Sequence, residues 1–563
     1  MKIPIQKTLV WLLGGLSISG VIAPALGLDT SISEAGINVY RLHQPPYNLT
    51  GRKIAIGQVE IGRPGLFGKD KAAVKNRTVI PAGVFYRNTP AQPNTHVDEH
   101  AAMVAAVMVS RDKGLRGVAP GAKLYASAVG SLSRSGQPEE CLSAQHIAQQ
   151  NGSDVRAINF SFGESLQRDP REEAVLDGNA LLTLCIDWSA RVHDVLYVIA
   201  GNQGKGGIPI PTDNFNGINA AYTAKRQGVF NKVDFANLSA LPVGIGRRMI
   251  RQEINVGSRR SINLVAPGNK ISLYDLKGKV TKVSGTSFAA PHITGAVALL
   301  QEFGDSALRK LRSRQEKLFL IESLRAETPN TGLHRLWMNW STDSRRHEVM
   351  KAVLLNSADK IQDLGDGMLL GMSRTIRAKD NHHWLESDAY QDPKIPLDMQ
   401  MGTGHLNGFR AYQQFKLGQW SPSGIGVPPV GWDYRTVEKS SYRDYVLTKP
   451  LAEGSFLSLT LAWDRLVELE DDNNNDAYDV GESFSDRGLN NLDLYLMPVG
   501  EEDITKSVCA SISEADAVEH IFCQVPAQGR YKIRVQYQQQ VNQPSQAYAL
   551  AWWTVPDPKS EAR

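Results

Sequence analysis

Residues 285–292 read Gly-Thr-Ser-Phe-Ala-Ala-Pro-His, and this stretch decides how the rest of the chain is interpreted. Small residues precede Ser287, and the apolar run 294–303 that follows it predicts a helix. The start of a helix offers free backbone N–H groups and the positive end of the helix dipole. Such donors suit the oxyanion that develops when a carbonyl is attacked. The stretch therefore makes Ser287 a candidate nucleophile, whereas a bare Gly-Thr-Ser triplet would indicate only a helix start rich in small residues.

A serine nucleophile needs a neighbouring base, and His100 is the best candidate among the 12 histidines. It begins a predicted helix of small and apolar residues, 100–107, and acidic residues precede it. Taken alone, such a histidine is more often an ordinary helix-end residue. His96 is the rival, but no helix of this composition follows it directly.

The base in turn needs an orienting carboxylate, and segment 51–62 offers one. Its sequence, GRKIAIGQVEIG, predicts a buried strand with Glu60 at the carboxyl end. Catalytic groups gather at that end of the strands in parallel sheets. The alternatives are that Glu60 is a solvated strand-end residue, or that Asp70 on the following loop takes this role. We favour Glu60 because it alone lies at the carboxyl end of the predicted strand.

Short apolar runs alternate with helical stretches between residues 50 and 408. The runs are near-continuous, as in strands covered on both faces, and lie at 54–59, 124–129, 155–160, 195–200 and 262–266. Candidate helices lie at 100–110, 141–150 and 180–191. This alternation predicts an α/β domain with a mostly parallel sheet.

Several segments, taken in chain order, closely resemble the motifs of the subtilisin-like serine peptidases, the subtilases. They are GRKIAIGQVEIG (51–62), GVAPGAKL (117–124), AINFSFG (157–163), LYVIAGN (196–202) and GTSFAAPH (285–292). The order acid, histidine, asparagine, serine is also that of the family. The helix of His100 keeps only part of the family's histidine motif. Glu60 stands where the family has an aspartate, although glutamate can serve in a serine triad.

The resemblance implies a three-layer subtilisin-like domain and an endopeptidase that cleaves proteins or peptides through an acyl-enzyme on Ser287. It implies a triad of Glu60, His100 and Ser287, with the side chain of Asn202 as a second oxyanion donor. The residues it implies for substrate binding are Ser161, Phe162, Gly163, Ala200 and Gly201. The alternative is a catalytically weak or inactive binding protein with the same fold.

Changes of composition divide the chain into segments. We predict a signal peptide at 1–25 and a peptidase domain at 26–417, with a charged helical insert at about 305–346. A linker rich in Gly, Pro and Ser follows at 418–431. Beyond it the apolar period changes to two, which predicts an antiparallel β-sandwich at 432–557.

The N-terminus is interpreted as an export signal. Lys2 and Lys7 accompany the apolar run 8–23, and Ala23-Pro24-Ala25 resembles a signal-peptidase site. A retained membrane anchor is the alternative, but glycines and serines dilute the run, which is short for a span. We expect a secreted or periplasmic protein without stable membrane association after signal removal. The net charge of +4 gives no reason to expect a nucleic-acid partner.

Export permits disulfides, and the chain has four cysteines. Their order predicts a local bridge between Cys509 and Cys523 within one hairpin. Cys141 and Cys185 would form the second bridge, and two buried free thiols are the alternative for this pair.

Residues 471–482 have the spacing of a calcium-binding loop. Its oxygen ligands at positions one, three, five, nine and twelve are Asp471, Asn473, Asn475, Asp479 and Glu482. Asp476 stands where glycine is preferred, and aspartate tolerates a left-handed turn better than most residues. The alternative is a solvated acidic loop between strands. We expect bound Ca²⁺ to stabilise the β-domain and not to take part in the chemistry.

Overall fold

The computed structural model describes residues 28–201, 209–226, 228–233, 256–324 and 340–558. The predicted signal peptide and Asn202 lie outside these residues. Within them, no helix combines the length and the apolar character that crossing a membrane requires.

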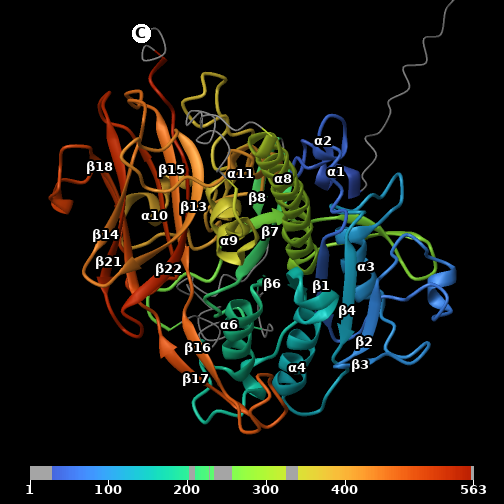
Figure 1. Ribbon diagram of the computed structural model, residues 1–563. Coiled ribbons are helices and arrows are strands. Elements are labelled where there is room, and N and C mark those ends of the chain that lie inside the picture. The colour runs from blue at the N-terminus through green and yellow to red at the C-terminus, as the bar shows by residue number, and fades with distance from the viewer. Residues whose placement is uncertain (1–27, 202–208, 227, 234–255, 325–339, 559–563) are drawn as a thin grey trace, which may run out of the picture.

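A ten-stranded, mostly parallel sheet forms the centre of the first domain, in the order β12-β8-β7-β6-β5-β1-β4-β2-β3, with β9 paired to β7 (Figure 1). Its strands are β1 Ala55–Glu60, β2 Gly83–Tyr86, β3 Thr89–Pro90, β4 Lys123–Ala128, β5 Val155–Phe160, β6 Leu196–Ala200, β7 Ile218–Arg226, β8 Val229–Lys232, β9 Leu264–Pro267 and β12 Ile376–Arg377. Only the β2–β3 and β7–β8 pairs among them are antiparallel. The predicted α/β class is confirmed.

Helices cover both faces of this sheet and make two separate apolar cores. Along β6, Leu196 and Val198 belong to the core that includes α3 and α8, whereas Tyr197 and Ile199 belong to the core that includes α4 and α6. A strand buried on both faces needs apolar side chains at every position, which explains the continuous apolar runs of the sequence. The helices are α3 Glu99–Val109, α4 Gln137–Ala148, α5 Gln150–Ser153, α6 Leu181–His193, α8 Ala290–Leu324, α9 His347–Asn356, α10 Asp388–Gln391 and α11 Gly408–Phe415.

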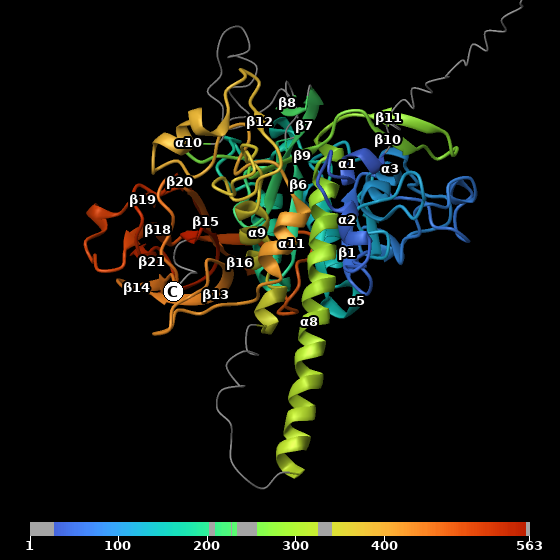
Figure 2. The ribbon, with the colours of Figure 1, turned by 90° about the horizontal axis from the view of Figure 1, so that it is seen from above.

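The helix after Ser287 is longer than predicted. α8 runs without interruption from Ala290 to Leu324, through the start of the predicted insert at residue 305. Its first turns are buried up to Glu302, and its far end extends away from the rest of the molecule (Figure 2). Residues 325–339 of the predicted insert lie outside the described residues.

A short N-terminal segment packs into the peptidase domain. It contains α1 Leu28–Ile32 and α2 Tyr40–His43, and its apolar side chains Ile32, Ile37, Val39 and Leu42 join the core of α3 and α8. Ser31 Oγ lies 2.7 Å from Nε2 of the buried His292 on α8. The segment that precedes β1 is therefore an integral part of this domain.

The second domain is the predicted antiparallel β-sandwich. One sheet has the order β13-β22-β15-β20 and the other β14-β21-β18-β19. Their strands are β13 Val430–Glu438, β14 Tyr442–Val446, β15 Phe456–Trp463, β18 Asn491–Pro498, β19 Cys509–Ser511, β20 Val518–Gln524, β21 Tyr531–Gln539 and β22 Ser545–Trp553. A core of Leu, Val, Ile, Tyr and Trp side chains fills the space between them.

Both predicted disulfides are present, but one differs in its setting. The Cys141–Cys185 bridge joins α4 to α6. The Cys509–Cys523 bridge was expected within one hairpin, and this setting is wrong, because β19 and β20 belong to different sheets. Sequence proximity suggested a hairpin, whereas the chain crosses from one sheet of the sandwich to the other between the two cysteines. The bridge therefore links the two sheets.

The two domains share a core. α9 packs against β15 and β22, and Trp432, Ala462 and Ala549 of the sandwich belong to the apolar core of α3 and α8. Ser458 Oγ and Thr460 Oγ1 both donate to Asn356 Oδ1, over 2.9 and 3.0 Å, at the end of α9. The sheet that contains β15 and β22 thus packs its inner face against the other sheet of the sandwich and its outer face against the peptidase domain.

A hairpin of β16 Leu466–Glu470 and β17 Ser483–Gly488 reaches back to the peptidase domain and lies against α6 (Figure 1). We call residues 466–488 the docking hairpin. Its side chains Val467 and Tyr478 pack with Cys141, Cys185 and Trp188, beside the first disulfide.

Arg465, just before the docking hairpin, forms the buried ion pair of this contact. Its guanidinium lies 2.9 Å from Asp187 Oδ2 on α6, and their side chains are 2% and 0% exposed. Its Nη2 also donates to Gly178 O over 2.8 Å, and its backbone N–H donates to Asn216 Oδ1 over 2.8 Å. Burial raises the pKa of Asp187, and the guanidinium opposes this effect.

We predict that Arg465→Met destabilises the whole molecule, because it leaves a buried carboxylate without its partner. The loss of one member of a buried pair costs about 3–5 kcal/mol. The measurement is the unfolding midpoint in urea. Arg487→Met on β17 is the matched control, since Arg487 pairs with Glu468 and both are about half exposed. Equal shifts in the two variants would contradict the prediction.

Candidate active site

Glu60, His100 and Ser287 meet at the carboxyl end of β1. Glu60 is the last residue of β1, His100 is the second residue of α3, and Ser287 lies in the 3₁₀ turn Thr286–Phe288 before α8. All three line one cavity of about 560 Å³. Sequence positions 227 residues apart are thus brought to one site by the sheet and its two adjoining helices.

A hydrogen bond joins the predicted base to the predicted carboxylate. Glu60 Oε2 lies 2.8 Å from His100 Nδ1, and the Glu60 side chain is 3% exposed. A carboxylate only accepts, so Nδ1 carries the proton and Nε2 is left free to act as a base. Burial by itself lowers the pKa of His100, but the Glu60 carboxylate outweighs it, and the pKa is raised above its ordinary value.

Two residues that the sequence did not single out position this pair. Gln58, on the same side of β1 as Glu60, donates through Nε2 to Ala101 O over 2.9 Å and to Glu60 Oε1 over 3.3 Å. Asp98 caps α3 by accepting the Ala101 N–H over 2.9 Å. Gln58 could have been found from the sequence, because residues two apart on a strand point to the same face. Asp98 could have been found because an acidic residue just before a helix often caps it.

The rivals considered in the sequence have other partners. Asp70 forms a fully buried pair with Arg63, with distances of 2.7 and 2.9 Å, so its carboxylate is already neutralised. His96 lines the same cavity, but its ring stacks on Tyr86 with centroids 4.2 Å apart. Neither residue is hydrogen-bonded to His100.

Ser287 is held close to its predicted partners but bonds elsewhere. Its Oγ donates to Ser161 O over 3.2 Å, and Ser161 Oγ donates to Ser287 O over 3.0 Å. Phe288, the next residue, makes an edge contact with the His100 ring at 5.6 Å. No hydrogen bond joins Ser287 to His100 in the described structure. Such bonds are often loose before substrate binds.

The predicted substrate-binding residues divide into two groups. Ser161 and Phe162 line the cavity, and residues 161–163 follow β5 without pairing in the sheet. Gly163, Ala200 and Gly201 are not among the cavity-lining residues. Gly201 instead accepts the Thr286 hydroxyl proton at its carbonyl, over 2.8 Å, which ties the end of β6 to the turn of Ser287.

The predicted calcium loop connects β16 to β17 and is closed by its own hydrogen bonds. Asn473 and Asn475 donate to Asp479 Oδ2, each over 2.8 Å, and Glu482 accepts backbone N–H groups of the loop. Asp476 adopts a φ of +57°, as the left-handed turn requires. The all-oxygen donor set fits Ca²⁺. Its three carboxylates are not gathered: in the described part of the chain, the one group of three or more ligating side chains within 4.8 Å is Asp194, His347 and Glu348.

Comparison with known proteins identifies the family. The model of the subtilase family matches residues 69–373, more than half of the chain, and the chain therefore belongs to this family. The match includes His100 and Ser287 and begins after Glu60. The docked β-sandwich lies beyond it.

The relatives are distant. The chain is 28% identical over 224 residues to the "Major intracellular serine protease" of Bacillus subtilis (strain 168), which covers 38% of this chain and 59% of the relative. It is 26% identical over 262 residues to "Thermitase" of Thermoactinomyces vulgaris, covering 46% and 77%. Among solved structures, "Crystal structure of MycP1 with the N-terminal propeptide removed" matches with a TM-score of 0.36 and 15% identity, over 65% of this chain and 92% of that one.

The raised pKa of His100 gives a testable pH dependence. A general base must be neutral, so we expect the reaction rate to rise with pH through the raised pKa of His100. Glu60→Gln removes the carboxylate that raises this pKa, so the rise of the rate on the acidic side of the pH profile moves to lower pH. Loss of a triad carboxylate also lowers the rate by about 10⁴-fold.

The measurement is the pH profile of Ser287 acylation by a fluorophosphonate. Glu99→Gln is the control, because Glu99 neighbours His100 but is exposed. An unchanged profile in Glu60→Gln would mean that Glu60 does not orient the base.

Proposed function

We propose that this protein is an exported serine endopeptidase with a Glu60–His100–Ser287 triad. The observation that carries the proposal is the 2.8 Å hydrogen bond between Glu60 and His100 at a cavity that Ser287 also lines. Membership of a family of serine peptidases supports the reaction class. Export to the periplasm or the medium is supported by the N-terminal sequence and by two disulfides.

The geometry supports a defined order of events. Ser287 Oγ leaves Ser161 O and turns to His100 Nε2, which takes its proton as Oγ attacks the substrate carbonyl. Glu60 accepts from Nδ1 throughout and stabilises the imidazolium. The backbone N–H of Ser287 and, in this proposal, the side chain of Asn202 stabilise the oxyanion. His100 then returns the proton to the leaving amine, and water hydrolyses the acyl-enzyme.

The substrate is a protein or peptide in an extended conformation. Ser161 and Phe162 line the cavity, and residues 161–163 do not pair in the sheet, so in this proposal their N–H and C=O groups serve a peptide lying alongside. Such pairing recognises the main chain and requires no particular side chain.

The second candidate is a binding protein with the same fold and little or no activity. The observation that favours it is the bond from Ser287 to Ser161 in place of one to His100, together with a glutamate at the position of the family's aspartate. The two candidates differ in whether Ser287 can be acylated.

We expect a fluorophosphonate probe to label the intact protein, and both Ser287→Ala and His100→Ala to abolish labelling. The first variant lacks the nucleophile and the second lacks the base that activates it. The measurement is covalent mass increase on a peptide that contains residue 287. His96→Ala is the control and should still be labelled, because its ring bonds to neither partner. Absence of labelling in the folded wild-type protein would favour the binding protein.

We also infer that the loop 471–482 holds a structural Ca²⁺, which would draw its carboxylates together by replacing the internal hydrogen bonds of the loop. The docking of this loop supports a stabilising role, since Gln145 on α4 bonds both the N–H and the C=O of Tyr478, over 2.6 and 3.1 Å. Such loops in extracellular modules bind with a Kd of about 10⁻⁴–10⁻³ M.

At about 10 mM Ca²⁺, well above this Kd, we expect the thermal midpoint to rise by several degrees relative to protein in chelator. Glu482→Gln should remove the rise because it removes a bidentate ligand. Glu470→Gln, at the end of β16 and outside the loop, should keep it. Scanning calorimetry measures the midpoint, and a rise that survives Glu482→Gln would place the ion elsewhere.

A further inference from the structure

The junction between the two domains contains a compact group of one histidine and three carboxylates. His347 and Glu348 begin α9, Asp194 lies at the turn between α6 and β6, and Asp464 follows β15 of the sandwich. His347 and Glu348 are 2% and 5% exposed.

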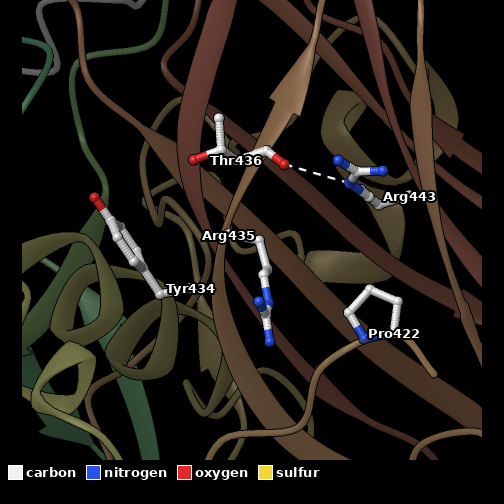
Figure 3. Close-up of a pocket in the computed structure, with 5 residues that line it drawn as sticks. All are labelled: Pro422, Tyr434, Arg435, Thr436 and Arg443. Carbon is white, nitrogen blue, oxygen red and sulfur yellow. Dashed lines mark hydrogen bonds between the residues drawn. The ribbon is translucent and has the colours of Figure 1, made fainter.

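Tyr434 on β13 completes the surroundings of this group. Its hydroxyl donates to Glu348 Oε1 over 3.3 Å. Figure 3 shows its ring turned away from Arg435 and Arg443, which line the hollow on the sandwich side. Both domains therefore contribute side chains to the group.

Three ligand atoms in this group lie close together. His347 Nδ1 is 3.0 Å from Asp194 Oδ1 and 3.2 Å from Glu348 Oε2, and one ligand atom from each of the three residues lies within 4.8 Å of the others. In a tetrahedral zinc site with bonds of about 2.0–2.2 Å, neighbouring ligand atoms are roughly 3.4 Å apart. The two distances from His347 Nδ1 are close to this value.

One buried carboxylate oxygen of the group has no hydrogen-bond partner. A proton on His347 Nδ1 can be donated to only one of the two carboxylates that face it. Glu348 Oε2 is buried and accepts no hydrogen bond. Arg346 is 3.6 Å from Asp194 and 42% exposed. Lys351 is buried and interacts with Asp464.

The second nitrogen of His347 has the partner that metal-binding histidines usually have. Nε2 lies 3.1 Å from Asp464 Oδ2. A carboxylate at this nitrogen holds the proton on Nε2 and directs the lone pair of Nδ1 towards an ion. Asp464 would therefore orient the ligand without touching the metal.

We propose that His347 Nδ1, Asp194 Oδ1 and Glu348 Oε2 form a binding site for Zn²⁺ at the domain junction. One imidazole and two carboxylates suit zinc, whereas Ca²⁺ prefers oxygen ligands alone. The Asp194 side chain is 31% exposed, which gives an ion a route in and water a place in the fourth position. The ion would link α9 and the α6–β6 turn to the sandwich through Asp464 and Tyr434. Its role would be structural, and it would take no part in the chemistry of Ser287.

A second histidine of the chain provides a matched control. His382 also lies between two carboxylates, with Asp380 2.5 Å from Nδ1 and Asp398 3.4 Å from Nε2. Because these two carboxylates face opposite nitrogens of the ring, they cannot coordinate one ion together with either nitrogen. His347 and His382 thus both have carboxylate neighbours, but only at His347 do two carboxylates face the same ring nitrogen.

The test uses the full chain with Ser287→Ala, which prevents self-digestion, after removal of metals with a chelator. We expect elemental analysis after dialysis against Zn²⁺ to find one bound ion per chain, and the thermal midpoint to rise with Zn²⁺. Co²⁺ in place of Zn²⁺ should give visible d–d absorption of a low-coordinate nitrogen–oxygen site. Excess Ca²⁺ should displace neither ion.

Glu348→Gln should abolish Zn²⁺ binding and the Co²⁺ spectrum, while its unfolding midpoint without metal shows that it folds. Asp464→Asn should weaken binding by about 10–100-fold, as the loss of an outer partner does. His382→Gln should bind as the parent does. Absence of stoichiometric Zn²⁺, binding unaffected by Glu348→Gln, or binding lost in His382→Gln would each overturn the proposal.

Discussion

The position of β1 is the constraint on which the candidate site depends. β1 pairs along both edges, with β4 and with β5, and all six of its residues are buried. Its carboxyl end is therefore fixed relative to α3, and Glu60 at that end reaches His100 in a hydrogen bond of 2.8 Å. Gln58 on the same strand donates to both Glu60 Oε1 and Ala101 O, and so links the carboxylate to the start of α3.

The C-terminal sandwich is built into the peptidase domain. The sandwich shares an apolar core with α8 and α9, its docking hairpin covers α6, and Arg465 neutralises Asp187 inside the peptidase domain. Since α6 leads directly into β6, whose end is tied to the turn of Ser287, the docking contacts also support the floor of the site. The sandwich therefore contacts the elements that carry the candidate site, through α6 and the cores of α8 and α9.

Much of the fold was predictable because burial leaves a simple pattern. Strands covered on both faces must be apolar throughout, and this pattern located β1, β4, β5, β6 and β9; alternation located the sandwich. The pairing of Glu60 with His100 followed from chain order and strand ends. The setting of Cys509–Cys523 was not predictable, because a separation of 14 residues fits a hairpin as well as a crossing between sheets. The continuation of α8 past residue 305 was missed because a charged helix leaving the core has no apolar period to follow.

The sequence by itself determined the class of the domain, the order of the strands along the chain and the residue types of the site, since these depend on local composition and spacing. Only the tertiary structure decided which other residues meet across long separations: Asp187 with Arg465, and Asp194 with His347 and Glu348. The physical reason is that a buried charge must find a partner in space. Spacing along the chain does not encode which distant segment supplies that partner.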